Sequence, residues 1–145
     1  MIRPFQIADT ASLLQLFQWN TPKYFGEEEV AHFETFLASN PSDFFVMEQD
    51  GIIVGCAGYG YKPDSCTGQV SWFVFHPDYQ GQGLGRKILD FCLAQLQAHK
   101  DIEKVIVRTS QLVDGFFSKA GFKTIYTKKD YWAPGYDLYT MELVC

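Results

Sequence analysis

The sequence predicts one α+β domain, in which strand patterns and helix patterns are interspersed along a chain of 145 residues. Three observations support this prediction. The chain is 47% hydrophobic, which is enough for a sizeable core at this length. Short β-type runs such as residues 70–75 and 105–109 are separated by helical patterns. No repeat, low-complexity tract or linker interrupts residues 1–145, so we expect a single domain.

The first half of the chain shows apolar periodicity broken by turn residues. It is expected to form a strand at 2–5, a helix beginning at Asp9 or Thr10, a helix beginning in 27–29, and strands at 44–48 and 52–59. Asp and Thr are favoured helix caps, and the acids at 27–29 suit the positive end of a helix dipole. Pro41 ends the second helix, and residues 49–51 provide a hairpin turn between the two strands.

The second half combines further strands with two more helices. It is expected to form a loop at 60–68, a strand at 69–75, a helix with apolar residues at every fourth position from 84 to 96, a strand at 105–109, a helix ending at Ala120, and strands at 122–127 and 136–144. The regular spacing directs one side of the long helix into the core. Gly121 stands where a glycine C-cap belongs, and residues 130–135 are expected to be the last loop.

Composition limits the partners and the compartment. A net charge of -5 and a pI near 5.1 argue against a nucleic-acid partner or an anionic membrane surface. No apolar stretch approaches the ~20 residues of a membrane helix, and the N-terminus lacks a signal-peptide pattern. Cys56 and Cys92 lie in apolar runs and are expected to be buried thiols, and the cysteines and histidines show no metal-site spacing. We therefore expect a soluble cytoplasmic protein without a metal. The sequence does not decide the oligomeric state, and a homodimer is one of the alternatives.

The most informative segment is the glycine-rich turn at residues 80–86, which joins a strand to a helix. Glycine can adopt positive φ and has no Cβ to keep a ligand from the backbone. The first turn of a helix also presents N–H groups at the positive end of its dipole, so the segment favours phosphate binding. The spacing is not that of a P-loop, and the next strand ends in Arg108 rather than in the acid of a Rossmann fingerprint.

Residues 80–86 instead fit Gln/Arg-x-x-Gly-x-Gly/Ala, which resembles the acetyl-coenzyme A signature of the GNAT superfamily of N-acetyltransferases. Residues 110–122 are similar to a second family pattern, Asn-x-x-Ala-x-x-Phe/Leu-Tyr-x-Lys-x-Gly-Phe. The predicted order of elements also resembles the GNAT fold, a central mixed, mostly antiparallel sheet flanked by helices. The resemblance implies transfer of an acetyl group from acetyl-CoA to a primary amine, by direct attack in a ternary complex.

The resemblance also implies which residues bind the coenzyme. They are Phe73, Phe75, Gln80, Gly81, Gln82, Gly83, Leu84, Gly85, Arg86, Ser110, Phe117 and Lys119. The turn would hold the phosphates, and the segment from Ser110 would flank the pantetheine arm. The backbone N–H of Phe73 would contact the acetyl oxygen, and Phe75 would pair with the pantetheine.

The general acid departs from the family pattern. Phe117 stands where the family has a tyrosine near the coenzyme sulfur, and a phenyl ring cannot protonate a thiolate. Its simpler interpretation is core packing. A proton would then come from water, from Ser110, or from Tyr126 or Tyr131, unless the thiol, with a pKa of ~8.5, leaves as its anion.

The general base departs as well. Gln69 stands near the position of the family's glutamate and cannot take a proton. Glu48 and His76 are other candidates, but a solvated hairpin residue and a turn residue are their simpler interpretations. No base is therefore assigned from the sequence.

The acceptor pocket of the family lies between the first two helices and the last hairpin loop. Aromatic residues in these segments include Trp19, Tyr24, Tyr131 and Trp132. With nearby acids they could attract a cationic amine, although core rings and solvated charges explain them equally well. The expected partner is an amine-bearing small molecule or peptide. A non-catalytic acyl-CoA-binding sensor or regulatory domain stays open, whereas the acidic balance disfavours an enzyme that acts on aminoacyl-tRNA.

Overall fold

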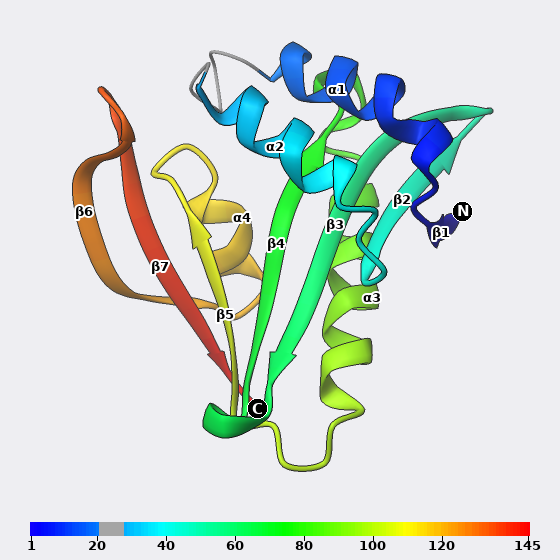
Figure 1. Ribbon diagram of the computed structural model, residues 1–145. Coiled ribbons are helices and arrows are strands. Elements are labelled where there is room, and N and C mark those ends of the chain that lie inside the picture. Colours follow the sequence, from blue (N-terminus) through cyan, green and yellow to red (C-terminus); the bar gives the residue numbers. More distant parts are fainter. Residues whose placement is uncertain (21–27) are drawn as a thin grey trace. The chain divides into compact units, whose positions relative to one another are not determined.

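The computed structural model describes residues 1–20 and 28–145 (Figure 1). Its helices and strands are β1 (Ile2–Pro4), α1 (Thr10–Trp19), α2 (Glu28–Ala38), β2 (Phe44–Gln49), β3 (Ile52–Lys62), β4 (Thr67–Phe75), α3 (Leu84–Gln97), β5 (Lys104–Thr109), α4 (Asp114–Lys119), β6 (Lys123–Ala133) and β7 (Tyr136–Val144). The strands follow the order β1-β2-β3-β4-β5-β7-β6 in one sheet. β4 and β5 are parallel, whereas β1–β2, β2–β3, β5–β7 and β6–β7 are antiparallel. The predicted α+β class with a mixed, mostly antiparallel sheet is confirmed.

The described residues belong to two compact units. The first unit comprises Met1–Gly58 and Trp72–Cys92, and the second comprises Tyr59–Ser71 and Leu93–Cys145. Three elements, β3, β4 and α3, contribute residues to both units. A single domain over residues 1–145 stays a prediction, and each unit is described by itself.

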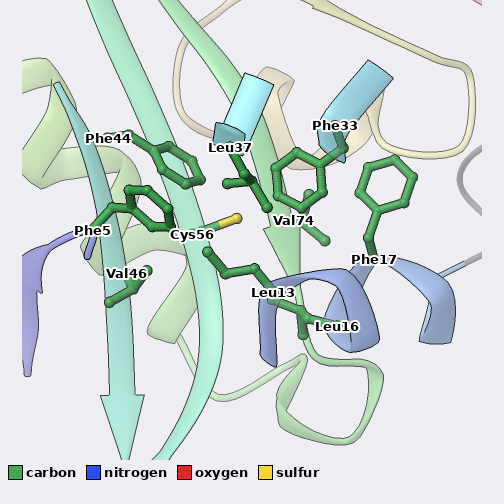
Figure 2. Packing of buried hydrophobic residues seen from close by; sticks show 10 residues of the cluster. All are labelled: Phe5, Leu13, Leu16, Phe17, Phe33, Leu37, Phe44, Val46, Cys56 and Val74. Carbon is green, nitrogen blue, oxygen red and sulfur yellow. The ribbon is translucent and has the colours of Figure 1, made fainter. Parts of the chain in front are cut away.

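The first unit has a core of aromatic and aliphatic side chains from both helices and several strands. Figure 2 shows its buried members, Phe5, Leu13, Leu16, Phe17, Phe33, Leu37, Phe44, Val46, Cys56 and Val74. α1 and α2 lie side by side, and Phe17 of α1 stacks on Phe33 of α2 with 4.9 Å between ring centroids (Figures 1 and 2). Phe45 lies between the buried Phe44 and Val46 on β2, and its ring centroid is 4.8 Å from that of Phe91 of α3. Because alternate strand residues point to opposite faces, helices pack on both faces of the strands in this unit.

The second unit is built on β5. Val105 and Val107 of this strand are buried, whereas Arg108 is exposed. α4 ends as predicted, because Gly121 has a φ of +100° and the N–H of Phe122 donates to the carbonyl oxygen of Phe117 at 3.1 Å. This bond satisfies a carbonyl group that the helix leaves without an internal donor.

Two loops expected from the sequence are shorter than predicted. Most of the predicted loop 60–68 has regular structure. β3 continues to Lys62, a 3₁₀ turn spans Pro63–Ser65, and β4 begins at Thr67. β6 continues to Ala133, so 130–135 is mostly strand. Asp130 makes this extension feasible, with a φ of +53° and a side chain that accepts the N–H of Gly135 at 2.8 Å. Asp130, a turn-forming residue type, thus lies within an irregular β-hairpin.

The start of α1 also differs in detail from the prediction. Asp9 occupies the position before the helix, but its side chain makes no capping hydrogen bond to α1. Its carboxylate instead accepts two hydrogen bonds from Arg3, at 2.8 and 2.9 Å, and one from the N–H of Gln6 at 2.8 Å. The Arg3 guanidinium consequently lowers the pKa of Asp9.

Candidate active site

The glycine-rich turn lies in the first unit and leads directly into α3. Gly81 and Gly83 have φ values of +80° and +77°, in the region that strains other residues. A Cβ added to either glycine would meet no atom within 4 Å. The space beside both glycines is therefore open, as a predicted phosphate-binding turn requires.

The first turn of α3 follows the glycines without a break. Leu84 is buried and anchors the turn, and the N–H of Lys87 donates to the carbonyl oxygen of Gly83 at 3.2 Å. The N–H groups of the first helical turn have no acceptor within the helix, which suits an anion. The exposed side chain of Arg86 forms an ion pair with Asp90 at 2.9 Å. The predicted contribution of Arg86 to phosphate binding would thus come from its main chain.

The strand before the turn contains a backbone irregularity that the sequence did not predict. Trp72 of β4 has a φ of +50°, which is unusual for a bulky residue. Its indole is held by three rings of the core, with centroid distances of 6.2 Å to Phe17, 5.0 Å to Phe33 and 5.5 Å to Phe36. Such conformations cost about 1–3 kcal/mol and persist where packing enforces them. The strain lies immediately before Phe73, the predicted contact of the acetyl oxygen.

Phe75 is positioned by a buried amide that the sequence analysis did not single out. Asn20 is 2% exposed, and its Nδ2 donates to the carbonyl oxygens of Phe75, at 3.0 Å, and Leu16, at 2.9 Å. The Phe75 ring lies against Gly55, where a Cβ would come within 2.5 Å of the ring. The backbone of Phe75, the predicted pantetheine partner, is therefore held in place by a side chain and by close packing, and its carbonyl oxygen already accepts one hydrogen bond.

The second coenzyme segment lies in the second unit. Ser110 is buried, and its Oγ accepts the N–H of Leu112 at 3.2 Å. Phe117 is 1% exposed and contacts Phe122 edge to face, as the packing interpretation of this residue predicts. Lys119 is exposed in the last turn of α4. The roles of Ser110, Phe117 and Lys119 in coenzyme binding stay predictions.

The predicted acceptor residues are distributed over both units. Trp19 lies in the first unit, half exposed, with its ring 4.8 Å from that of His76. His76 accepts the N–H of Asp78 on its Nδ1 at 3.1 Å, so it acts as a turn residue, as expected. Tyr24 lies outside the described residues.

Tyr131 and Trp132 of β6 lie together in the second unit, and both contact Arg108. The Arg108 guanidinium carbon is 5.2 Å from the Tyr131 ring centroid and 5.6 Å from that of Trp132. Its Nη2 donates to the Tyr131 Oη at 2.8 Å, and the Trp132 Nε1 donates to the carbonyl oxygen of Thr109 at 3.1 Å. In the sequence, Arg108 is marked only as the end of a predicted strand. No sequence pattern links Arg108 to these aromatic residues, because Tyr131 follows it by 23 residues along the chain.

The carboxylates proposed from the sequence have other partners or surroundings. Glu48, next to the β2–β3 turn, is partly exposed and accepts a hydrogen bond from the Arg3 Nε at 2.6 Å. Asp137 accepts the N–H of Asp130 within the β6–β7 hairpin at 2.9 Å. Glu29 of α2 is partly buried, and desolvation, followed by repulsion from Glu28, raises its pKa to about 7.

The second unit also contains a cavity of about 340 Å³ between β3 and β4. It is lined by Tyr59, Gly60, Tyr61, Lys62, Gln69 and Ser71. Gln69, predicted to lie near the family's base position, therefore lines this cavity. Its neutral amide can donate and accept hydrogen bonds but cannot remove a proton.

The family comparison identifies the chain. The model of the acetyltransferase (GNAT) family matches residues 11–122, a span that contains the glycine-rich turn and the second segment. The chain belongs to the GNAT family. That Gln69 and Phe117 stand at the family's base and acid positions stays a prediction.

Individual GNAT relatives resemble parts or all of the chain. An amino-acid acetyltransferase of Vibrio atlanticus is 30% identical over 82 residues, which are 57% of this chain and 18% of that protein. The chain thus spans less than a fifth of the length of this relative. Among solved structures, a ribosomal-protein-alanine N-acetyltransferase of Brucella melitensis has a TM-score of 0.77 at 20% identity, covering 100% of this chain and 99% of its own. An acetyltransferase of Salmonella typhimurium, solved with its cofactor acetyl-CoA, has a TM-score of 0.68 at 20% identity, covering 99% and 92%. These structures share the GNAT fold.

Other expectations for this GNAT chain concern cysteines, metals and membranes. Cys56 and Cys92 are buried thiols, as predicted, and burial raises the pKa of Cys92 to about 12. Within residues 1–20 and 28–145, no group of His, Cys, Asp and Glu is arranged to hold a metal ion. None of the helices described is long and apolar enough to cross a bilayer.

Proposed function

We propose that this GNAT protein is an acetyl-CoA-dependent N-acetyltransferase, which acetylates a primary amine on a small molecule or peptide. The observation that carries the proposal is the conformation of Gly81 and Gly83, both at positive φ, with open space beside them at the entry to α3. Their position inside the family match supports acetyl-CoA as the cosubstrate. We further propose that the protein is cytoplasmic and that the reaction needs no metal. The net charge of -5 disfavours nucleic acid as a partner.

The proposed chemistry is direct attack of the neutral amine on the thioester carbonyl. The N–C bond forms, the C–S bond breaks, the sulfur leaves as a thiolate, and the nitrogen gives up its extra proton to water. Holding both reactants in one complex supplies a large entropic advantage. The N–H of Phe73 would contact the acetyl oxygen, and removal of one such donor costs about 3–4 kcal/mol of transition-state stabilisation in other enzymes.

The remaining proposed roles follow the two coenzyme segments. Residues 80–86 would hold the phosphates, and Phe75 would pair with the pantetheine. Ser110, Phe117 and Lys119 would flank the pantetheine arm in the second segment. Ser110 is the candidate for proton delivery to the leaving sulfur, because its hydroxyl oxygen acts as an acceptor in its hydrogen bond with the N–H of Leu112 and the hydroxyl can also donate.

Calorimetric titration with acetyl-CoA tests the phosphate cradle. Gly83→Val should weaken binding at least tenfold, because a branched side chain would fill the approach to the backbone. Gly51→Val is the matched control, since Gly51 has a φ of +80° and also has no atom within 4 Å of an added Cβ. Gly51 lies in the β2–β3 turn, so the control introduces the same backbone strain away from the cradle. Equal affinity in the two folded variants would refute the cradle.

Turnover is tested separately, by release of free thiol from acetyl-CoA. The amine panel comprises amino acids, polyamines, aminoglycosides and peptides. Transfer to at least one class is the expected result. Stoichiometric binding of acetyl-CoA without turnover on any amine would instead support a non-catalytic sensor or regulatory domain.

A further inference from the structure

Arg108 lies on the face of β5 that is turned away from the core of the second unit. Val105 and Val107 are buried, so the alternate residues Ile106 and Arg108 point to the opposite face. The register pairs Gln69, which lines the cavity, with Ile106, and Val70 with Val107. Ile106 therefore lies beside the β4 side of the cavity, and Arg108 follows two residues further along the same face of β5.

The guanidinium of Arg108 is oriented by aromatic side chains rather than by an acid. One nitrogen, Nη2, donates to the Tyr131 Oη, and the rings of Tyr131 and Trp132 both lie within 6 Å of the guanidinium carbon. No carboxylate among the described residues forms an ion pair with Arg108. The remaining N–H donors keep the fork geometry that binds carboxylates in a bidentate manner.

The cavity has the size for a small molecule, and its lining combines polar and apolar groups. Its volume of about 340 Å³ is at the lower end of the range for small-ligand pockets. Gln69 and Ser71 of β4 and Lys62 of β3 offer hydrogen-bond groups and a second cation. Arg108, two residues beyond Ile106 on the same face of β5, would add a charge-specific contact for a negatively charged group that extends from this cavity.

We propose that Arg108 binds a carboxylate of the acceptor, so that the acceptor is a small molecule with both an amine and a carboxylate. This inference rests on the proposed acetyltransferase activity and specifies its substrate class. Arg108 acts as a specificity-determining residue, through charge-assisted hydrogen bonds to the substrate, while Tyr131 and Trp132 fix the guanidinium. The acidic side chains of the β6–β7 hairpin are engaged in that hairpin and do not compete for the guanidinium.

The test compares a carboxylate acceptor with its carboxamide. The best acceptor among the L-α-amino acids and the ω-amino acids is chosen, and kcat/KM is measured for it and for its amide. The wild type should favour the carboxylate roughly 10- to 100-fold, the value of one hydrogen-bonded charge. Arg108→Met should abolish most of this preference. The amine pKa differs between the two substrates but not between the enzymes, so the change in preference isolates the side chain.

Two further variants keep the test decisive. Lys104→Met removes one positive charge from the other end of β5 and should leave the preference unchanged. If Arg108→Met does not fold, Arg108→Lys keeps the charge but loses the fork and should lower the preference several-fold. A loss of rate that is equal for both substrates would overturn the proposal and assign Arg108 to support of the hairpin.

The outcomes also separate this inference from the proposed function. Acetylation of amines by the wild type without any preference for the carboxylate would refute only the inference. Failure to acetylate any amine would refute the proposed function itself. Binding of the carboxylate acceptor to the complex with coenzyme A, measured by calorimetry, gives a readout independent of turnover, and Arg108→Met should weaken it roughly tenfold or more.

Discussion

Glu29 of α2 couples the stability of the protein to pH. Its pKa rises from an ordinary value of 4.5 to about 7, because burial and then Glu28 disfavour the charged form. The native state therefore holds the proton more tightly than the unfolded state. The free energy of unfolding should fall as pH rises from 4.5 to 7, by about 1–2 kcal/mol after allowance for solvent screening.

Glu29→Gln should remove this decrease and stabilise the protein at pH 8. Urea unfolding at pH 5 and pH 8 measures the effect. Glu34→Gln, a change to an exposed carboxylate of the same helix, is the control and should retain the wild-type decrease. A Glu29→Gln variant with an unchanged pH dependence would show that Glu29 is as well solvated as its exposed neighbours.

Phe117 gives a second residue-scale prediction, because its ring is buried where the family pattern has tyrosine. Phe117→Tyr should lower the free energy of unfolding by about 1–3 kcal/mol, the cost of a buried hydroxyl without a partner. Phe116→Tyr is the matched control, since Phe116 is only partly buried and its hydroxyl could reach water. Urea denaturation compares the two. Equal stabilities would reveal a hydrogen-bond partner at 117 and revive the interpretation of this position as a proton donor.

At the residue scale, the sequence predicts a conformation where the residue type itself favours it. It does not predict a conformation that depends on packing against distant residues. The glycines of 80–86 predict a turn because glycine marks positive φ, and Gly81 and Gly83 adopt it. Trp72 also has positive φ, but nothing in an apolar run indicates this, because the strain is enforced by three rings from α1 and α2. The proposed role of Arg108 was not predicted for a related reason. It depends on contacts with Tyr131 and Trp132, which are distant in sequence.

Among the elements, β3 and β4 depend on a close contact that only glycine permits. A Cβ at Gly55 would lie 2.5 Å from two carbons of the Phe75 ring, well below van der Waals contact. Gly55→Ala should therefore destabilise the protein by about 1–3 kcal/mol and displace the Phe75 backbone. Because Phe75 is the proposed pantetheine partner, we also expect weaker acetyl-CoA binding, measured by calorimetry on the folded variant.

Gly60→Ala is the matched control, as Gly60 lies on the same strand and has no atom within 4 Å of an added Cβ. It should change the unfolding free energy and the affinity for acetyl-CoA only slightly. Comparable losses in both variants would show that β3 tolerates no alanine for reasons of backbone conformation. The contact with Phe75 would then have no special weight.

The elements were predicted best where periodicity decides and worst where turn residues are satisfied inside a strand. The stripe on α3 is a clear case, since Leu84, Ile88, Cys92 and Leu96 are all buried. The segment 130–135 is the opposite case. Asp, Pro and Gly favour a loop there, yet the Asp130 side chain binds the Gly135 N–H and lets β6 continue to Ala133.

On the scale of the whole molecule, the sequence predicts the order of elements and the family, but not the division into two compact units. The order of strands and helices and the family signature can be read from local patterns, and both are confirmed. The division into two compact units cannot be read in this way, because β3, β4 and α3 each contribute to both units without any composition change. The net charge belongs to the chain as a whole and supports a prediction of its own.

A chain with net charge -5 should repel extended polyanions even if it binds one small coenzyme through main-chain N–H groups. Long-range attraction to RNA or heparin requires an excess of Lys and Arg over a broad surface, whereas a cradle of N–H groups acts over a few ångströms. We therefore expect retention on an anion exchanger at pH 7.5 and no retention on heparin at about 0.1 M salt. Acetyl-CoA affinity should fall only slightly between low and moderate salt, because few cations are neutralised. Tight heparin binding, or a steep salt dependence for acetyl-CoA, would mean that side-chain cations rather than the backbone hold the phosphates, and would reopen an aminoacyl-tRNA acceptor.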